Sequence, residues 1–142
     1  VAHTYYWGDQ RRDVLIGSER AKQISPLRSA EKIGLRFSTH LDTPIVPMQP
    51  LLSAWSSVNR LTASGATLGE DERIGVIRAL KAITLDAAWQ VHLDHEIGSI
   101  SVGKYADFTL LADNPLLHPE KLKDIQIIET IIGGVSYFEG KK

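Results

Sequence analysis

The sequence predicts an α/β fold in which alternating strands and helices are followed by a smaller β-rich part. In the first half, short apolar and aromatic runs alternate with amphipathic segments, and from Gly98 onward apolar residues recur at every second position. The order strand, helix, strand, helix is typical of parallel strands joined by right-handed crossovers. We therefore place a boundary near Asp94, between an α/β part (residues 1–94) and a β-rich part (residues 95–142).

The first predicted strand spans residues 1–6, and a polar loop follows it. Ser25 and Pro26 are typical of a helix start, because serine can cap free amides and proline needs no donor in the first turn. Gly34 supplies a left-handed stop for this helix. The second strand is predicted for residues 35–39.

Pro50 opens a second helix in which Trp55 lies on the apolar face. A polar loop separates this helix from two further helical segments, and Thr84 is a suitable cap between those two. Their apolar positions have helical spacing: Ile74, Ile77 and Leu80 in the first, then Leu85, Ala88, Trp89 and His92 in the second.

The β-rich part contains a strand at residues 108–111 and two more at residues 125–132 and 135–138. Gly133 and Gly134 separate the last two strands, and a two-residue glycine turn between apolar runs is a strong hairpin signal. The segment Gly103-Lys104-Tyr105-Ala106-Asp107 is polar and bounded by a turn glycine, which favours a structural role.

The composition of the chain argues against nucleic-acid binding and membrane spanning. The formal net charge of −1 offers no basic face for nucleic acid, and no apolar run reaches membrane length. The absence of cysteine excludes disulfides and thiolate metal sites and fits a cytoplasmic protein, so any metal would be held by His, Asp or Glu. Because the chain opens directly at Val1 and its one methionine is Met48, we expect the C-terminal segment of a larger protein.

The most informative stretch is Phe37-Ser38-Thr39-His40-Leu41-Asp42-Thr43-Pro44-Ile45. It is predicted to be a strand whose tip presents the imidazole of His40 and the carboxylate of Asp42, and Pro44 ends the pairing. In parallel α/β proteins the loops after the strands form the reaction face. One carboxylate and one imidazole do not complete a hydrolytic site, so further groups must come from elsewhere.

Six motifs in order resemble the C-terminal part of the amidohydrolase superfamily, most closely its amidohydrolase-3 (YtcJ-like) branch, which also contains proteins described as exoenzyme regulatory proteins. Together they run through nearly the whole chain: His3 with Tyr5-Tyr6-Trp7-Gly8-Asp9, Ile24-Ser25-Pro26-Leu27-Arg28-Ser29-Ala30, His40-Leu41-Asp42-Thr43-Pro44-Ile45, Leu51-Leu52-Ser53-Ala54-Trp55, Thr84-Leu85-Asp86-Ala87-Ala88, and Gly98-Ser99-Ile100 through Gly103-Lys104-Tyr105-Ala106-Asp107-Phe108.

The resemblance implies the C-terminal βαβα portion of a (β/α)8 barrel plus a small β-hairpin-rich domain. Residues 1–6 and 35–39 would be the seventh and eighth barrel strands, and residues 98–138 the C-terminal share of the β-domain. It also implies a divalent metal, zinc, in the full-length protein. The family's remaining metal ligands would lie upstream, so we expect no cofactor in this segment alone.

Asp42 is implied to be both the catalytic acid–base residue and a metal ligand at the end of the last strand. A carboxylate there accepts and relays a proton from the attacking water. The alternative is an Asp that caps the following helix. Leu41 is bulkier than the small residue usual before this Asp in the family, which affects the predicted pocket shape.

The predicted substrate-binding residues are His3, Tyr6, Trp7 and His40. Ordinary packing is an equally open reading of His3 and the aromatic loop, and a structural role is an equally open reading of His40. Asp9 and Asp13 flank Arg11 and Arg12, which favours a solvated loop there. The other histidines lack metal-ligand spacing and are expected at the surface or in packing: His92, His95 and His118.

Taken together, these features predict the C-terminal segment of a metal-dependent amidohydrolase that hydrolyses a C–N bond in a small, non-peptide substrate. The alternatives are a non-catalytic regulatory or binding protein on the same fold, and an end segment that assists assembly. The expected partners are a small molecule, the missing N-terminal part of the chain and a second copy of the protein, with neither nucleic acid nor membrane.

Overall fold

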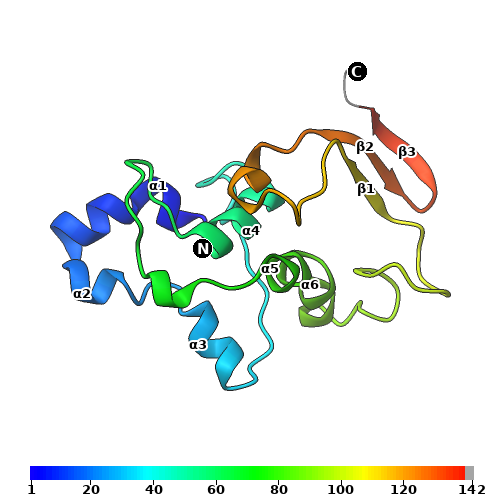
Figure 1. The fold of residues 1–142 in the computed structure, drawn as a ribbon. Coiled ribbons are helices and arrows are strands. Elements are labelled where there is room, and N and C mark those ends of the chain that lie inside the picture. Colours follow the sequence, from blue (N-terminus) through cyan, green and yellow to red (C-terminus); the bar gives the residue numbers. More distant parts are fainter. Residues whose placement is uncertain (140–142) are drawn as a thin grey trace.

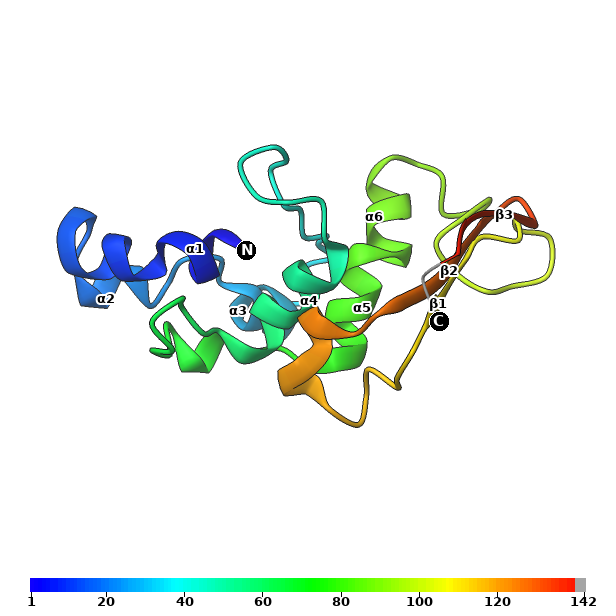
Figure 2. The ribbon, with the colours of Figure 1, turned by 90° about the horizontal axis from the view of Figure 1, so that it is seen from above.

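The computed structural model describes residues 1–139, a mixed α/β arrangement in which a group of helices is followed by a sheet (Figure 1). From above, α1 and α2 lie at one end, the sheet lies at the other, and α4 and α5 lie between them (Figure 2). The elements are α1 (His3–Gln10), a π-helical turn (Arg11–Leu15), α2 (Ser18–Ala21), α3 (Leu27–Lys32), α4 (Pro50–Asn59), a 3₁₀ turn (Glu70–Glu72), α5 (Val76–Ile83), α6 (Leu85–Gln90), β1 (Phe108–Leu111), a 3₁₀ helix (Pro119–Asp124), β2 (Ile127–Ile132) and β3 (Val135–Glu139).

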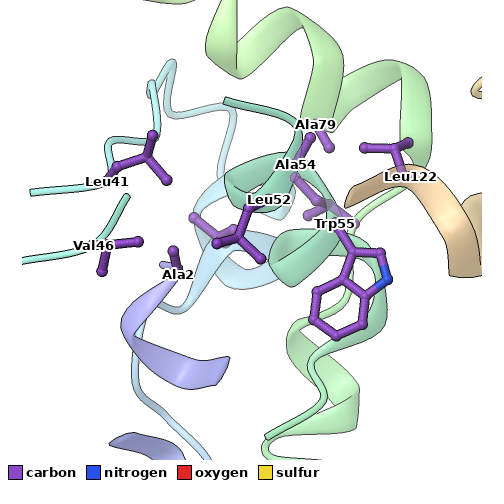
Figure 3. Close-up of a cluster of buried hydrophobic side chains, with 10 residues drawn as sticks. Ala2, Leu41, Val46, Leu52, Ala54, Trp55, Ala79 and Leu122 are labelled. Carbon is purple, nitrogen blue, oxygen red and sulfur yellow. The ribbon is translucent and has the colours of Figure 1, made fainter. Parts of the chain in front are cut away.

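Helix α4 is the centre of the core. It begins at Pro50, as predicted, and residues 52–57 are all buried, so neighbours cover it on every side. Leu41 and Val46 approach it from one direction, whereas Ala79 of α5 and Leu122 approach it from another (Figure 3). Trp55 also donates from its indole N–H to the carbonyl of Glu120 at 2.8 Å, which ties α4 to the segment before β2. The loop that carries Leu41 is therefore anchored on a well-packed helix.

The C-terminal sheet is antiparallel, in the order β1-β2-β3. Phe108 pairs with Ile131, and Ile132 pairs with Val135 across the turn. Gly133 and Gly134 have φ angles of 57° and 81°, the left-handed values that a tight primed hairpin turn requires. The predicted hairpin and the strand at residues 108–111 are confirmed.

Helix caps differ from the prediction. Gly34 follows α3 with a φ of 73°, as expected of a left-handed stop, but the residue that precedes α3 is Pro26, and Ser25 makes no side-chain cap bond. The hydroxyl of Thr84 donates backward to the carbonyl of Leu80 at 2.8 Å and so does not cap α6. Both residues lie at the predicted boundaries without supplying the predicted hydrogen bonds.

The strand predicted for residues 1–6 is wrong, because this segment enters helix α1. The backbone amides of Thr4 and Tyr5 bond to the carbonyls of Val1 and Ala2 at 2.9 and 3.0 Å. A strand needs neighbours to satisfy its peptide groups, whereas a helix satisfies them locally. Thr4 and Gly8 are the buried residues of α1, and their spacing of four is helical.

The strand predicted for residues 35–39 is also absent, and so is the parallel βαβα pairing. Within residues 1–139 the three-stranded sheet is antiparallel and lies beyond residue 107. Residues 35–39 instead attach to the helices: Thr39 donates its amide to the carbonyl of Ala82 at 3.2 Å, and Arg78 of α5 lies over the ring of Phe37 at 3.8 Å. These contacts take the place of a strand ladder.

Arg60 links distant segments around the end of α4. Its side chain is fully buried and donates to the carbonyls of Leu68, Ser25 and Ile24 at 2.9, 3.0 and 2.7 Å, with a longer bond of 3.4 Å to Lys22. Burial lowers the pKa of this guanidinium.

The helices within residues 1–139 include none with the length and apolar character of a membrane span.

Candidate functional site

Asp42 lies in the loop between α3 and α4, in a conformation uncommon for a side-chain-bearing residue. Its φ is 65°, and its carbonyl accepts the amide of Ile45 at 2.8 Å, which closes a turn. About half of its side chain is exposed. The residue before α4 is Gln49, so Asp42 does not cap that helix and the capping alternative is wrong. Left-handed non-glycine residues cost free energy and occur often at functional sites.

A cavity of about 400 Å³ opens beside Asp42. One part of its lining is polar, with Thr39, His40, Asp42, Thr43 and Ser53, and the other is apolar, with Leu41, Met48, Pro50 and Ile83. The Ser53 hydroxyl donates to that of Thr39 at 3.0 Å, which fixes two hydroxyls on the cavity wall. A carboxylate therefore faces a space that suits a small molecule with both polar and apolar groups.

His3 meets Asp42 although 39 positions separate them in the sequence. The distance from His3 Nε2 to Asp42 Oδ2 is 3.4 Å. On the other side of the ring, Arg11 Nη2 lies 3.2 Å from His3 Nδ1. Burial, and secondarily the charge of Arg11, lowers the pKa of His3. The structure thus places the imidazole of His3, with its lowered pKa, between a guanidinium and the exposed carboxylate.

The other predicted binding residues divide into two groups. His40 lines the cavity beside Asp42. Tyr6 and Trp7 lie in α1 and are not among the lining residues; Trp7 packs edge-on against His3 with ring centroids 5.2 Å apart, and Tyr6 is 40% exposed. The structure therefore brings His40 to the cavity directly, whereas Trp7 packs against His3, which meets Asp42 but does not itself line the cavity.

The sequence pattern does not identify Arg11 as a residue of the site, because the acidic neighbours Asp9 and Asp13 suggest a solvated loop. Arg12 does pair with Asp13 and Asp9, at 2.7 and 3.2 Å. Arg11, however, is eight residues after His3, about two helical turns, and helical spacing is the signal that would connect the two. Met48, Ser53 and Ile83 reach the cavity from separate segments, with no local motif.

Asp9 is held by the loop after α4 and is not part of the cavity. Burial acts to raise its pKa, but hydrogen bonds from the hydroxyls of Thr62 and Ser64, each 2.8 Å long, and the nearby Arg12 outweigh burial and lower it. This carboxylate therefore ties α1 to the loop that contains Thr62.

The described residues do not fit a complete metal shell. Asp42 offers one carboxylate, but within residues 1–139 no group of three or more His, Asp or Glu side chains is placed to hold an ion. Catalytic zinc takes three protein ligands and a water. The site therefore offers at most part of a metal centre.

Comparison with known proteins gives the family. The family model described as "Amidohydrolase family" matches residues 1–138. The N-substituted formamide deformylase of Arthrobacter pascens is 31% identical over 82% of this chain and 22% of its own length. The YtcJ protein of Bacillus subtilis (strain 168), which carries an amidohydrolase name, is 29% identical over 98% of this chain and 26% of its own length.

A solved structure agrees with this result at the level of the fold. The crystal structure of an amidohydrolase from Thermotoga maritima MSB8 matches 80% of this chain and 26% of that chain, with a TM-score of 0.55 and 22% identity. The chain spans about a quarter of the length of the relatives it matches. The chain belongs to the amidohydrolase family and corresponds to a C-terminal part of such a protein.

Proposed function

We propose that this chain is part of a metal-dependent enzyme that hydrolyses a C–N bond in a small, non-peptide amide, and that Asp42 is its proton-transfer residue. The observation that carries the proposal is the position of Asp42: half-exposed, in a left-handed turn, on the wall of a cavity of about 400 Å³. Membership of the amidohydrolase family and similarity to a protein named as a formamide deformylase support the reaction class.

The chemistry requires a base that later acts as an acid. In the proposed reaction the Asp42 carboxylate accepts a proton from water as the water oxygen attacks the amide carbonyl carbon. The same group then delivers the proton to the departing nitrogen, so that the C–N bond breaks and an amine leaves. A carboxylate can perform both steps because it is regenerated when the amine departs.

His40 and the two cavity hydroxyls are proposed to bind the polar part of the substrate, opposite the apolar wall. The divalent metal that the family implies, proposed to be zinc, would need ligands beyond those that these residues offer together. We therefore assign no step to it.

We further assign residues 1–94 to the last part of a (β/α)8 barrel and residues 95–142 to a small β-domain. The mixed α/β architecture and the fold similarity to the Thermotoga amidohydrolase support this assignment. The rest of the same chain would then be the main partner of this segment, and would supply the parallel strands that residues 1–94 do not form in the described structure.

Amine release by the full-length protein tests the proposal. The substrates are N-alkyl and N-aryl formamides and the corresponding acetamides, with a dipeptide as the contrasting substrate, and the protein is assayed with zinc and after chelation. We expect metal-dependent amine release from the small amides and little from the dipeptide. If the folded, metal-loaded protein binds these amides without cleaving them, the enzymatic assignment is wrong and the binding alternative is favoured.

A further inference from the structure

Three side chains form a continuous series of contacts from α1 to the cavity. Arg11 Nη2 lies 3.2 Å from His3 Nδ1, and His3 Nε2 lies 3.4 Å from Asp42 Oδ2. Only Asp42 of the three lines the cavity. Arg11 and His3 therefore reach the proposed chemistry through Asp42.

The chemistry of Arg11 decides which nitrogen of His3 carries the proton. A guanidinium has five N–H donors and no acceptor, so a ring nitrogen in contact with it must offer its lone pair. His3 Nδ1 is consequently the acceptor, and the proton of the neutral ring resides on Nε2. A second proton on Nδ1 would point at the Arg11 donor.

The surroundings of the His3 ring favour the tautomer with its proton on Nε2. His3 Nε2 is buried and makes no hydrogen bond among the described residues; Asp42 Oδ2 lies 3.4 Å away, beyond the ordinary hydrogen-bond distance. The charged and titratable side chains that face the ring are Arg11, Asp42 and His40. The edge of Trp7 packs against the same ring and restricts its rotation.

We propose that Arg11 and His3 are positioning residues for Asp42: Arg11 fixes the neutral imidazole with its proton on Nε2, and this N–H holds the carboxylate at the cavity. In this proposal the buried N–H donates to Asp42 once the 3.4 Å contact shortens on substrate binding, as contacts in unliganded sites often do. A neutral donor orients a carboxylate without the full charge of an imidazolium, which would weaken it as a base.

The role of Arg11 and His3 in catalysis rests on the proposed function. The contacts among Arg11, His3 and Asp42 do not depend on it. The tautomer of His3 is measurable without turnover, by long-range ¹H–¹⁵N NMR of the imidazole nitrogens in the full-length protein. The spectra are recorded at about pH 8, above the ordinary imidazole pKa of ~6.5. The His3→Gln variant identifies the His3 signals by their loss.

Four variants at three positions separate an effect of the Arg11 contact on the His3 tautomer from a general effect of changed charge. Arg11→Lys keeps a cationic donor beside Nδ1, whereas Arg11→Glu places an acceptor there. Arg20→Glu makes the same charge reversal at an exposed residue of α2 and is the matched control. Asp42→Ala removes the proposed acceptor of the Nε2 proton.

We expect the Nε2–H form in the wild type, Arg11→Lys and Arg20→Glu, and a shift of ~10-fold or more toward Nδ1–H in Arg11→Glu. Asp42→Ala should speed exchange of the Nε2 proton with water. A wild-type His3 that is protonated or carries its proton on Nδ1 would overturn the proposal, even if Arg11→Glu failed to fold. An unchanged tautomer in folded Arg11→Glu would overturn it as well. Loss of amide hydrolysis with the expected tautomers would count against the proposed function alone.

Discussion

Replacing Arg60 with methionine is expected to destabilise the protein strongly, because the guanidinium is fully buried and satisfies three backbone carbonyls from two separate segments. Three of its hydrogen bonds are 3.0 Å or shorter. A hydrogen bond from a charged group contributes about 1.5–3 kcal/mol. The burial of the charge offsets part of this, so we use the lower value for each of the three bonds, which gives a loss of about 4.5 kcal/mol. Methionine fills much of the same volume, so the loss reports the polar head and not a cavity.

Urea unfolding followed by tryptophan fluorescence measures this loss, because Trp55 is in the core. With a slope of about 2 kcal/mol per molar urea, the midpoint should fall by about 2 M. The matched control is Arg20→Met, at an exposed position, with an expected change within about 0.5 kcal/mol. A loss below about 1 kcal/mol for Arg60→Met, with an unchanged slope, would refute the reasoning that these bonds hold the segments together.

Three further predictions concern stability and association. Gly69→Ala should lower the free energy of unfolding by at least about 2 kcal/mol, because φ is 68° and the new Cβ would lie 1.9 Å from the carbonyl oxygen of Lys22. The control is Gly65→Ala, where φ is also positive but no atom lies within 4 Å of the new Cβ. In thermal melts of both variants, Gly65→Ala should lose less stability than Gly69→Ala. The folded-state pKa of Asp9 lies below its usual value, so the stability that the Asp9 carboxylate provides is present above about pH 4 and is lost as the pH falls further. The difference in unfolding free energy between the wild type and Asp9→Asn should therefore shrink between about pH 5 and pH 3. A difference that stays constant over this range would contradict the assignment. The exposed apolar side chains of the sheet predict self-association of this segment, and a sedimentation coefficient that stays at the monomer value across micromolar concentrations would contradict it.

Local signals account for the elements that the sequence predicts well. Proline at the first position of α4 and glycine after α3 act through their own backbone preferences, and so does the pair Gly133-Gly134 in the hairpin turn. These preferences do not depend on distant partners. The start of α4, the end of α3 and the hairpin were therefore predictable.

The incorrect predictions concern segments whose conformation depends on neighbours. The aromatic residues of α1 are typical of strands, but strand preference reflects packing against adjacent strands, and in the described structure none lies beside this segment. Arg60 bonds only to backbone carbonyls, which carry no residue-specific signal in the sequence. The approach of His3 to Asp42 likewise arises from the tertiary fold, although both residues were predicted to belong to the site.

The turnover of Asp42→Asn in the full-length, metal-loaded protein tests the central claim most directly. Asparagine is nearly isosteric but cannot accept the proton, so kcat for a small amide should fall by about three orders of magnitude or more, while thermal stability changes little. Asp71→Asn, an exposed substitution of the same kind outside the cavity, should retain wild-type kcat. A folded Asp42→Asn enzyme that cleaves the amide at a near-normal rate would show that Asp42 is not the proton-transfer residue.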